Sequence, residues 1–158
     1  MAIRDISSAS ASCGEITLTD TPSAADFRTI FRALDEFNAR VIGHARVSPL
    51  AVLLRDESGT VVGGLWGRTN YSWLTIEMLY VPAPLRGRGV GSALVRRAEA
   101  AGRQRGCIGI NVDTFDFQAR AFYERLGFVV FGVHEDLPPG HQCFYLCKRL
   151  DQKPEGAT

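Results

Sequence analysis

The sequence lacks the excess of basic residues that is typical of nucleic-acid-binding proteins and the long apolar runs that are typical of membrane proteins. Its 18 basic and 17 acidic residues leave a net charge of only +1 over 158 residues, so the charge balance favours neither a nucleic acid nor an acidic membrane surface as a partner. No apolar run approaches the ~20 residues that a membrane-spanning helix needs. The chain also has no internal repeat and no linker within residues 14–150, which we therefore expect to form one domain. The Ser/Ala-rich residues 1–13 and residues 151–158 are expected to be flexible tails.

Cysteine and histidine are scarce and scattered. Cys13, Cys107, Cys143 and Cys147 contain no CxxC pair, and the three histidines do not join them in a cluster with the spacing of a zinc site. We therefore expect no metal and no disulfide framework. Free thiols are typical of a reducing compartment, which predicts a cytoplasmic protein.

The hydrophobic pattern predicts a mixed α/β fold. Apolar residues at helical spacing follow Ser23, an expected N-cap with Asp26 in the first turn. Hairpins followed by strand–helix–strand units imply a mixed sheet with helices packed on it. The expected strands are residues 14–18 (weakly), 50–55, 61–67, 73–81, 108–112, 129–133 and 143–148, and the later helices are residues 90–105 and 119–126.

The strongest local indication of a binding site is a glycine-rich turn between the expected strand at residues 73–81 and the expected helix at residues 90–105. Gly87, Gly89 and Gly91 alternate with Arg86 and Arg88 immediately before the helical pattern. Glycine lets backbone N–H groups approach phosphate oxygens, and the helix that follows offers its unpaired N-terminal donors to the same anion. The alternative is an ordinary strand-to-helix turn with two solvated arginines.

A dinucleotide-binding turn is a rival interpretation, because the glycines resemble that fingerprint and Asp113 lies near the distance of a ribose-binding acid. However, the GxGxxG spacing places Ser92 at its last position. The Pro82-x-Pro84 elbow and the preceding hairpins also disfavour this class.

The second motif is Ala119-x-x-Phe122-Tyr123-x-x-x-Gly127-Phe128. On a helix, Ala119 and Tyr123 share a stripe that lies about 100° from the stripe of Phe122. A small residue beside a phenol suits a wall against which a narrow ligand lies, although a tyrosine in such a position more often only packs.

Together, Arg86-x-x-Gly89-x-Gly91 and the motif around Tyr123 resemble the GCN5-related N-acetyltransferase (GNAT) family, over roughly residues 51–150. The resemblance implies an α/β domain at residues 14–150 with a mixed, mostly antiparallel sheet flanked by helices. It implies transfer of an acetyl group from acetyl-CoA, without a metal, to a primary amine of a small molecule, a lysine side chain or an N-terminus in a ternary complex. The first fifty residues match no family motif.

The resemblance also implies roles for individual residues. The pantetheine arm would lie along residues 73–81, with the backbone N–H near Leu79 polarising the thioester and the pyrophosphate on the glycine turn. Tyr123, a neutral donor at pH 7, would protonate the departing thiolate. The family often has asparagine where this chain has Asp116, whose carboxylate cannot donate a hydrogen bond as an amide does; Asp116 is alternatively a helix cap. The residues expected at the cofactor are Leu79, Tyr80, Val81, Arg86, Gly87, Arg88, Gly89, Val90, Gly91, Ser92, Asp116, Ala119 and Phe122.

A general base is needed because an alkylamine is mostly protonated at pH 7. Glu77, in an otherwise apolar strand, is the favoured candidate, acting directly or through water; its alternative role is a salt bridge with Arg68. Asp113 is a second candidate. His134 and His141 are weaker ones, as is a nucleophilic Cys143 or Cys147, which no neighbour in sequence activates.

The sequence leaves the acceptor open. Glu77, Asp113, Glu135 and Asp136 suit a cationic amine, whereas Trp66, Tyr71 and Trp73 suit an aromatic one. A CoA-binding sensor or interaction module without transfer activity is the alternative function, and a homodimer is possible.

Overall fold

A computed structural model describes residues 14–151. The chain divides into two compact units, Met1–His44 and Ala45–Thr158, and each is described by itself. The expected tails, residues 1–13 and all but the first residue of 151–158, lie outside the described residues. The expectation that residues 14–150 form a single domain therefore stays a prediction.

The described part of the first unit contains one helix, α1 (Ala24–Ile42), and residues 14–23 before it have no regular secondary structure. Ser23 caps the helix as expected: its hydroxyl accepts the N–H of Asp26 (3.1 Å), and its own N–H donates to the Asp26 carboxylate (2.8 Å). The weak strand expected at residues 14–18 is wrong. A strand needs a partner to satisfy its backbone groups, and no described segment pairs with these residues.

The apolar residues of α1 lie at helical spacing as expected. Within the described part of its own unit the helix buries none of them, and Phe27 and Phe31 stack on each other with ring centroids 5.9 Å apart. Whether this stripe faces a core stays a prediction.

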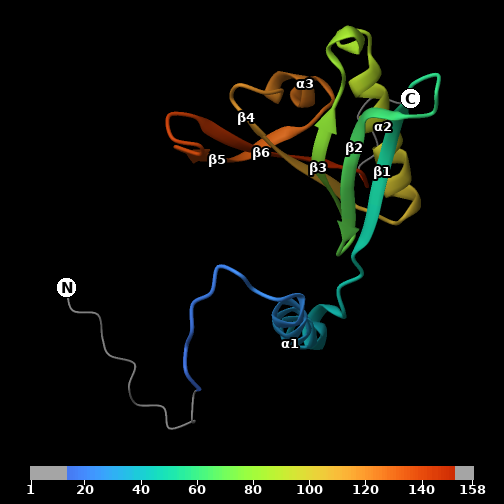
Figure 1. Cartoon of the computed structure of the whole chain (residues 1–158). Coiled ribbons are helices and arrows are strands. Elements are labelled where there is room, and N and C mark those ends of the chain that lie inside the picture. Colours follow the sequence, from blue (N-terminus) through green and yellow to red (C-terminus); the bar gives the residue numbers. More distant parts are fainter. Residues whose placement is uncertain (1–13, 152–158) are drawn as a thin grey trace. The chain divides into compact units, whose positions relative to one another are not determined.

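The second unit is built on a six-stranded sheet with the order β1-β2-β3-β4-β6-β5 (Figure 1). Every neighbouring pair is antiparallel except β3 and β4, which are parallel. The mixed, mostly antiparallel sheet is therefore confirmed. Its strands are β1 (Ser48–Arg55), β2 (Val61–Asn70), β3 (Trp73–Tyr80), β4 (Gly109–Phe115), β5 (Val129–Glu135) and β6 (Gln142–Arg149).

The core lies between the sheet and the helix α2 (Val90–Gln104), which packs against β1 to β4. Leu94, Val95 and Ala98 point from one stripe of α2 into this core, as the apolar spacing predicts. The shorter helix α3 (Arg120–Arg125) adds Tyr123 to the same core.

Strand β3 has the feature that positions the site. Ile76 pairs with Gly67 and Met78 with Trp66, so Glu77 is an extra residue, a β-bulge that bends the strand. The parallel pairing with β4 ends at Ile76 and Val112. Beyond that point β3 follows β2 while β4 follows β6, so the two halves of the sheet diverge (Figure 1).

A glycine opposite the bulge is required by this geometry. A Cβ on Gly67 would lie 2.1 Å from the Thr75 carbonyl oxygen, whereas a Cβ on Gly132 in β5 would lie at an ordinary 3.7 Å from the Tyr145 ring. We expect Gly67→Ala to lower the free energy of unfolding by about 1–3 kcal/mol, because backbone must move to relieve the overlap. Gly132→Ala is the matched control, with a much smaller loss. Urea denaturation measures both, and equal losses would contradict the constraint at Gly67.

Candidate active site

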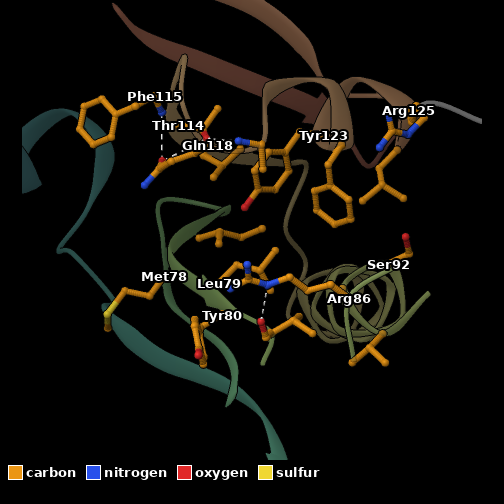
Figure 2. Close-up of a pocket in the computed structure, with 18 of the residues that line it drawn as sticks. Met78, Leu79, Tyr80, Arg86, Ser92, Thr114, Phe115, Gln118, Tyr123 and Arg125 are labelled. Atoms are coloured by element: carbon orange, nitrogen blue, oxygen red, sulfur yellow. Dashed lines mark hydrogen bonds between the residues drawn. The ribbon is translucent and has the colours of Figure 1, made fainter. Parts of the chain in front are cut away.

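The divergence of β3 and β4 leaves a cavity of about 1010 Å³. This is the upper end of the size range of small-molecule sites, so the cavity suits a large ligand. Its walls come from three segments that the sequence keeps apart: the end of β3, the glycine turn with the start of α2, and the segment from β4 to α3 (Figure 2). The lining residues are 76–81, 85–87, 89–92, 112–115, 117–119, 122, 123, 125 and 126.

The β3 wall offers unpaired backbone groups. Residues 78–80 pair with β2 on one side, and no described strand pairs with them on the other. Backbone N–H and C=O groups that lack a ladder partner bond to water or to a ligand. An extended ligand with amide groups can therefore lie along β3 as a strand would.

The glycine turn offers donors for an anion. Gly87 and Gly89 have positive φ angles of 70° and 80°, which favour glycine. Gly89 is the N-cap of α2 and provides no side chain to cap it, so the first N–H groups of the helix, up to Ser92, have no side-chain acceptor. These residues line the cavity, where the helix dipole also favours negative charge.

The two arginines of the turn are placed differently. Arg86 lines the cavity, and its Nε donates to the Val81 carbonyl (2.9 Å), which ties the turn to the end of β3. The Arg86 guanidinium also lies 5.9 Å from the centre of the Tyr80 ring. Arg88 does not line the cavity.

Tyr123 is held in an apolar setting on α3. It is 4% exposed, and its ring packs edge-on against Phe122 and Phe128. Burial, and secondarily the negative charge of Asp113, raises the pKa of Tyr123 to about 12. The phenol therefore remains a proton donor at neutral pH, and Figure 2 shows its hydroxyl directed toward β3.

Both carboxylates considered as a base line the cavity, but their surroundings differ. Glu77 forms an ion pair with Arg68, so the salt bridge expected as its alternative role is confirmed. The carboxylate of Asp113 forms no hydrogen bond or ion pair with another described residue.

The weaker candidates lie elsewhere. Among the described residues, neither His134 nor His141 lines the cavity. Burial, and then Asp113, raises the pKa of the Cys143 thiol, which makes it a poor nucleophile. Cys107, Cys143 and Cys147 are free thiols, and the described residues contain no group of side chains that could hold a metal.

Asp116 is turned away from the cavity that it was expected to line. Its carboxylate accepts the N–H of Gln142 (3.3 Å) and lies 3.0 Å from Nδ1 of His141. The alternative interpretation of Asp116 as a helix cap is wrong, because α3 begins at Arg120, its N-cap is Ala119, and no side chain caps it. Asp116 instead ties the β4–α3 loop to the start of β6.

Three polar lining residues were missed by sequence reasoning: Thr114, Gln118 and Arg125. Gln118 and Arg125 both face the cavity, and Arg125 forms no ion pair with another described residue. Arg125 is an unspecified position of the motif around Tyr123 and Gln118 lies directly before it, but the helical stripes considered were those of Ala119 and Phe122. The loop that turns Gln118 inward is non-helical, so spacing alone could not place it.

The residues expected to shape an acceptor site are dispersed. Glu135 accepts from the Gln142 side chain (2.9 Å) and Asp136 from the Gly140 N–H (3.2 Å), so both stabilise the β5–β6 hairpin. Trp66, Tyr71 and Trp73 are not among the described residues that line the cavity. No described helix has the length and apolar character of a membrane span.

The fold and the cavity define an α/β protein whose opened sheet can take an extended, anionic ligand. The family model of the acetyltransferase (GNAT) family matches residues 17–128. The chain therefore belongs to the GNAT family and is an acetyltransferase, as the two motifs predict.

Individual proteins agree with this assignment. The chain is 45% identical to a blasticidin-S acetyltransferase of Streptomyces morookaense over 95 residues, 60% of this chain and 70% of the relative. The crystal structure of an acetyltransferase from Agrobacterium tumefaciens is 33% identical, with a TM-score of 0.79 over 86% of this chain and 99% of that one. A Bacillus anthracis protein described as a streptothricin acetyltransferase, solved in complex with acetyl coenzyme A, shares the fold at 22% identity, with a TM-score of 0.56 over 64% and 62% of the chains.

Proposed function

We propose that this acetyltransferase moves the acetyl group of acetyl-CoA to a primary amine of a small molecule while both substrates are bound. The observation that carries this proposal is the opening between β3 and β4, which has a glycine turn at one wall and a protonated Tyr123 at another. The pyrophosphate fits the donors of the turn, and the pantetheine arm, with its two amides, fits the unpaired edge of β3.

The reaction then follows from groups on β3 and α3 that line the cavity. The thioester of acetyl-CoA supplies the acetyl group. Glu77, held in place by Arg68, takes a proton from the ammonium of the acceptor, directly or through water. The backbone N–H near Leu79 stabilises the negative charge on the carbonyl oxygen while the C–N bond forms. As the C–S bond breaks, Tyr123 gives its proton to the sulfur. The nitrogen loses its second proton to water, and Tyr123 regains a proton from solvent.

The acceptor we propose is a cationic small molecule. Glu77 on β3 and Asp113 on β4 both line the cavity, and two carboxylates in one cavity favour a positively charged amine. The blasticidin-S acetyltransferase that resembles this chain supports a basic antibiotic as the first acceptor to test.

Calorimetric titration with acetyl-CoA, followed by a thiol-release assay with a panel of amines, tests the function. We expect acetyl-CoA and CoA to bind and NADH not to bind. We expect blasticidin S or an aminoglycoside to release free CoA. Absence of acetyl-CoA binding would contradict the proposal. Binding without turnover of any amine would favour a CoA-binding sensor instead.

Tyr123→Phe tests the proton donor. We expect kcat at saturating substrates to fall by about 10²-fold, while the Kd of acetyl-CoA stays unchanged, because the ring still packs but has no proton to give. Since the pKa is raised to about 12, ionisation of Tyr123 should cause no loss of wild-type rate below about pH 11. Tyr71→Phe, in the β2–β3 turn, is the control. An unchanged kcat in Tyr123→Phe would remove the assigned role.

Glu77→Gln tests the base. We expect kcat/KM for the amine to fall by about 10²-fold at pH 7. The deficit should shrink as the pH approaches the amine's own pKa of ~10.4, because neutral amine then needs no base. Asp113→Asn is the comparison variant and should retain most of kcat, because the Asp113 carboxylate attracts the cationic amine but takes no proton from it. The reverse result, with Asp113→Asn impaired and Glu77→Gln active, would assign the base to Asp113.

A further inference from the structure

The loop between β4 and α3 holds one side chain in an orientation that the mechanism above does not use. Gln118 accepts two hydrogen bonds at its Oε1, from the N–H of Phe115 (3.0 Å) and from the hydroxyl of Thr114 (3.2 Å). The Thr114 hydroxyl in turn accepts the N–H of Ala119 (3.3 Å). The hydroxyl hydrogen must therefore point to Gln118, and Thr114 itself is only 3% exposed.

These bonds determine which end of the amide faces the cavity. A backbone N–H can only donate, so the atom of Gln118 beside Phe115 must be the oxygen. The amide nitrogen is then on the other side, as Figure 2 shows, and it bonds to no other described residue. Gln118 thus presents two N–H donors and no acceptor from the wall that faces β3.

The chemistry of this group limits what it can bind. An ammonium has no lone pair to accept a hydrogen bond, so Gln118 cannot recognise the cationic amine. Phosphate oxygens are accommodated at the glycine turn, where the helix dipole and Arg86 supply positive charge. A neutral donor such as this amide suits a neutral carbonyl oxygen.

We infer that Gln118 donates a hydrogen bond to an amide carbonyl of the pantetheine arm and so positions the arm against β3. This inference rests on the proposed function. In this role Gln118 replaces the family's asparagine, whose position here is Asp116. Asp116 cannot serve, because its carboxylate has no N–H and is turned toward His141. The arm is then held from both sides, by the β3 backbone on one wall and by Gln118 on the other.

Gln118→Glu tests this role with a nearly isosteric side chain. One carboxylate oxygen still accepts from Phe115 and Thr114, but the cavity side now offers an acceptor instead of a donor. Calorimetry would measure the Kd of CoA and of adenosine 3′,5′-bisphosphate, a fragment that lacks the arm. We expect the affinity for CoA to fall about 10-fold or more and that for the fragment to change less than about 2-fold.

Two further variants complete the experiment. Gln118→Leu removes the donor without adding charge and should weaken CoA binding by about 3–10-fold. Gln104→Glu, at the exposed end of α2 outside the cavity, carries the same charge change and should leave both affinities unaltered. Equal losses for CoA and the fragment in the Gln118 variants, or no loss of CoA affinity, would overturn the inference alone. Absence of CoA binding by the unchanged protein would overturn the proposed function with it.

Discussion

The site depends on the point at which two parallel strands stop pairing. β3 and β4 bond to each other only as far as Ile76 and Val112, and the bulge at Glu77 then bends β3 away. Because a backbone group without a ladder partner still needs a hydrogen bond, the free edge of β3 is open to water or to a hydrogen-bonding ligand. Gly67, whose missing side chain lets β2 and β3 approach opposite the bulge, supports this arrangement from outside the cavity.

The walls of the cavity differ in the chemical groups that they offer to a ligand. Gly89 leaves the first N–H groups of α2 uncapped, which favours an anion. On the facing wall, burial keeps the Tyr123 phenol protonated, and Thr114 fixes the direction of the Gln118 amide. A ligand with phosphates at one end and amides along a flexible arm complements both walls.

Sequence patterns predicted most of the strands, the glycine turn and Tyr123. They failed where contacts between distant segments determine whether a strand forms or which way a side chain points. The glycine turn and Tyr123 could be found because their local chemistry is specific, and the strands at residues 50–55 and 143–148 because their apolar pattern is regular. Residues 14–18 showed a similar but shorter alternation and form no strand, since no segment within residues 14–151 pairs with them. Asp116 and Gln118 are two residues apart, and only the contact of Asp116 with β6 shows that Gln118, and not Asp116, faces the cavity. The cytoplasmic location and a homodimer stay predictions.

Amide hydrogen exchange with and without acetyl-CoA is the most direct measurement of whether the open edge of β3 holds the acetyl donor. We predict that the amides of residues 77–81 and 87–92 exchange more slowly when acetyl-CoA is bound, while those of the β1–β2 hairpin do not change. Binding of acetyl-CoA that leaves exchange along β3 unaltered, with protection confined to other segments, would contradict the central role of the strand opening.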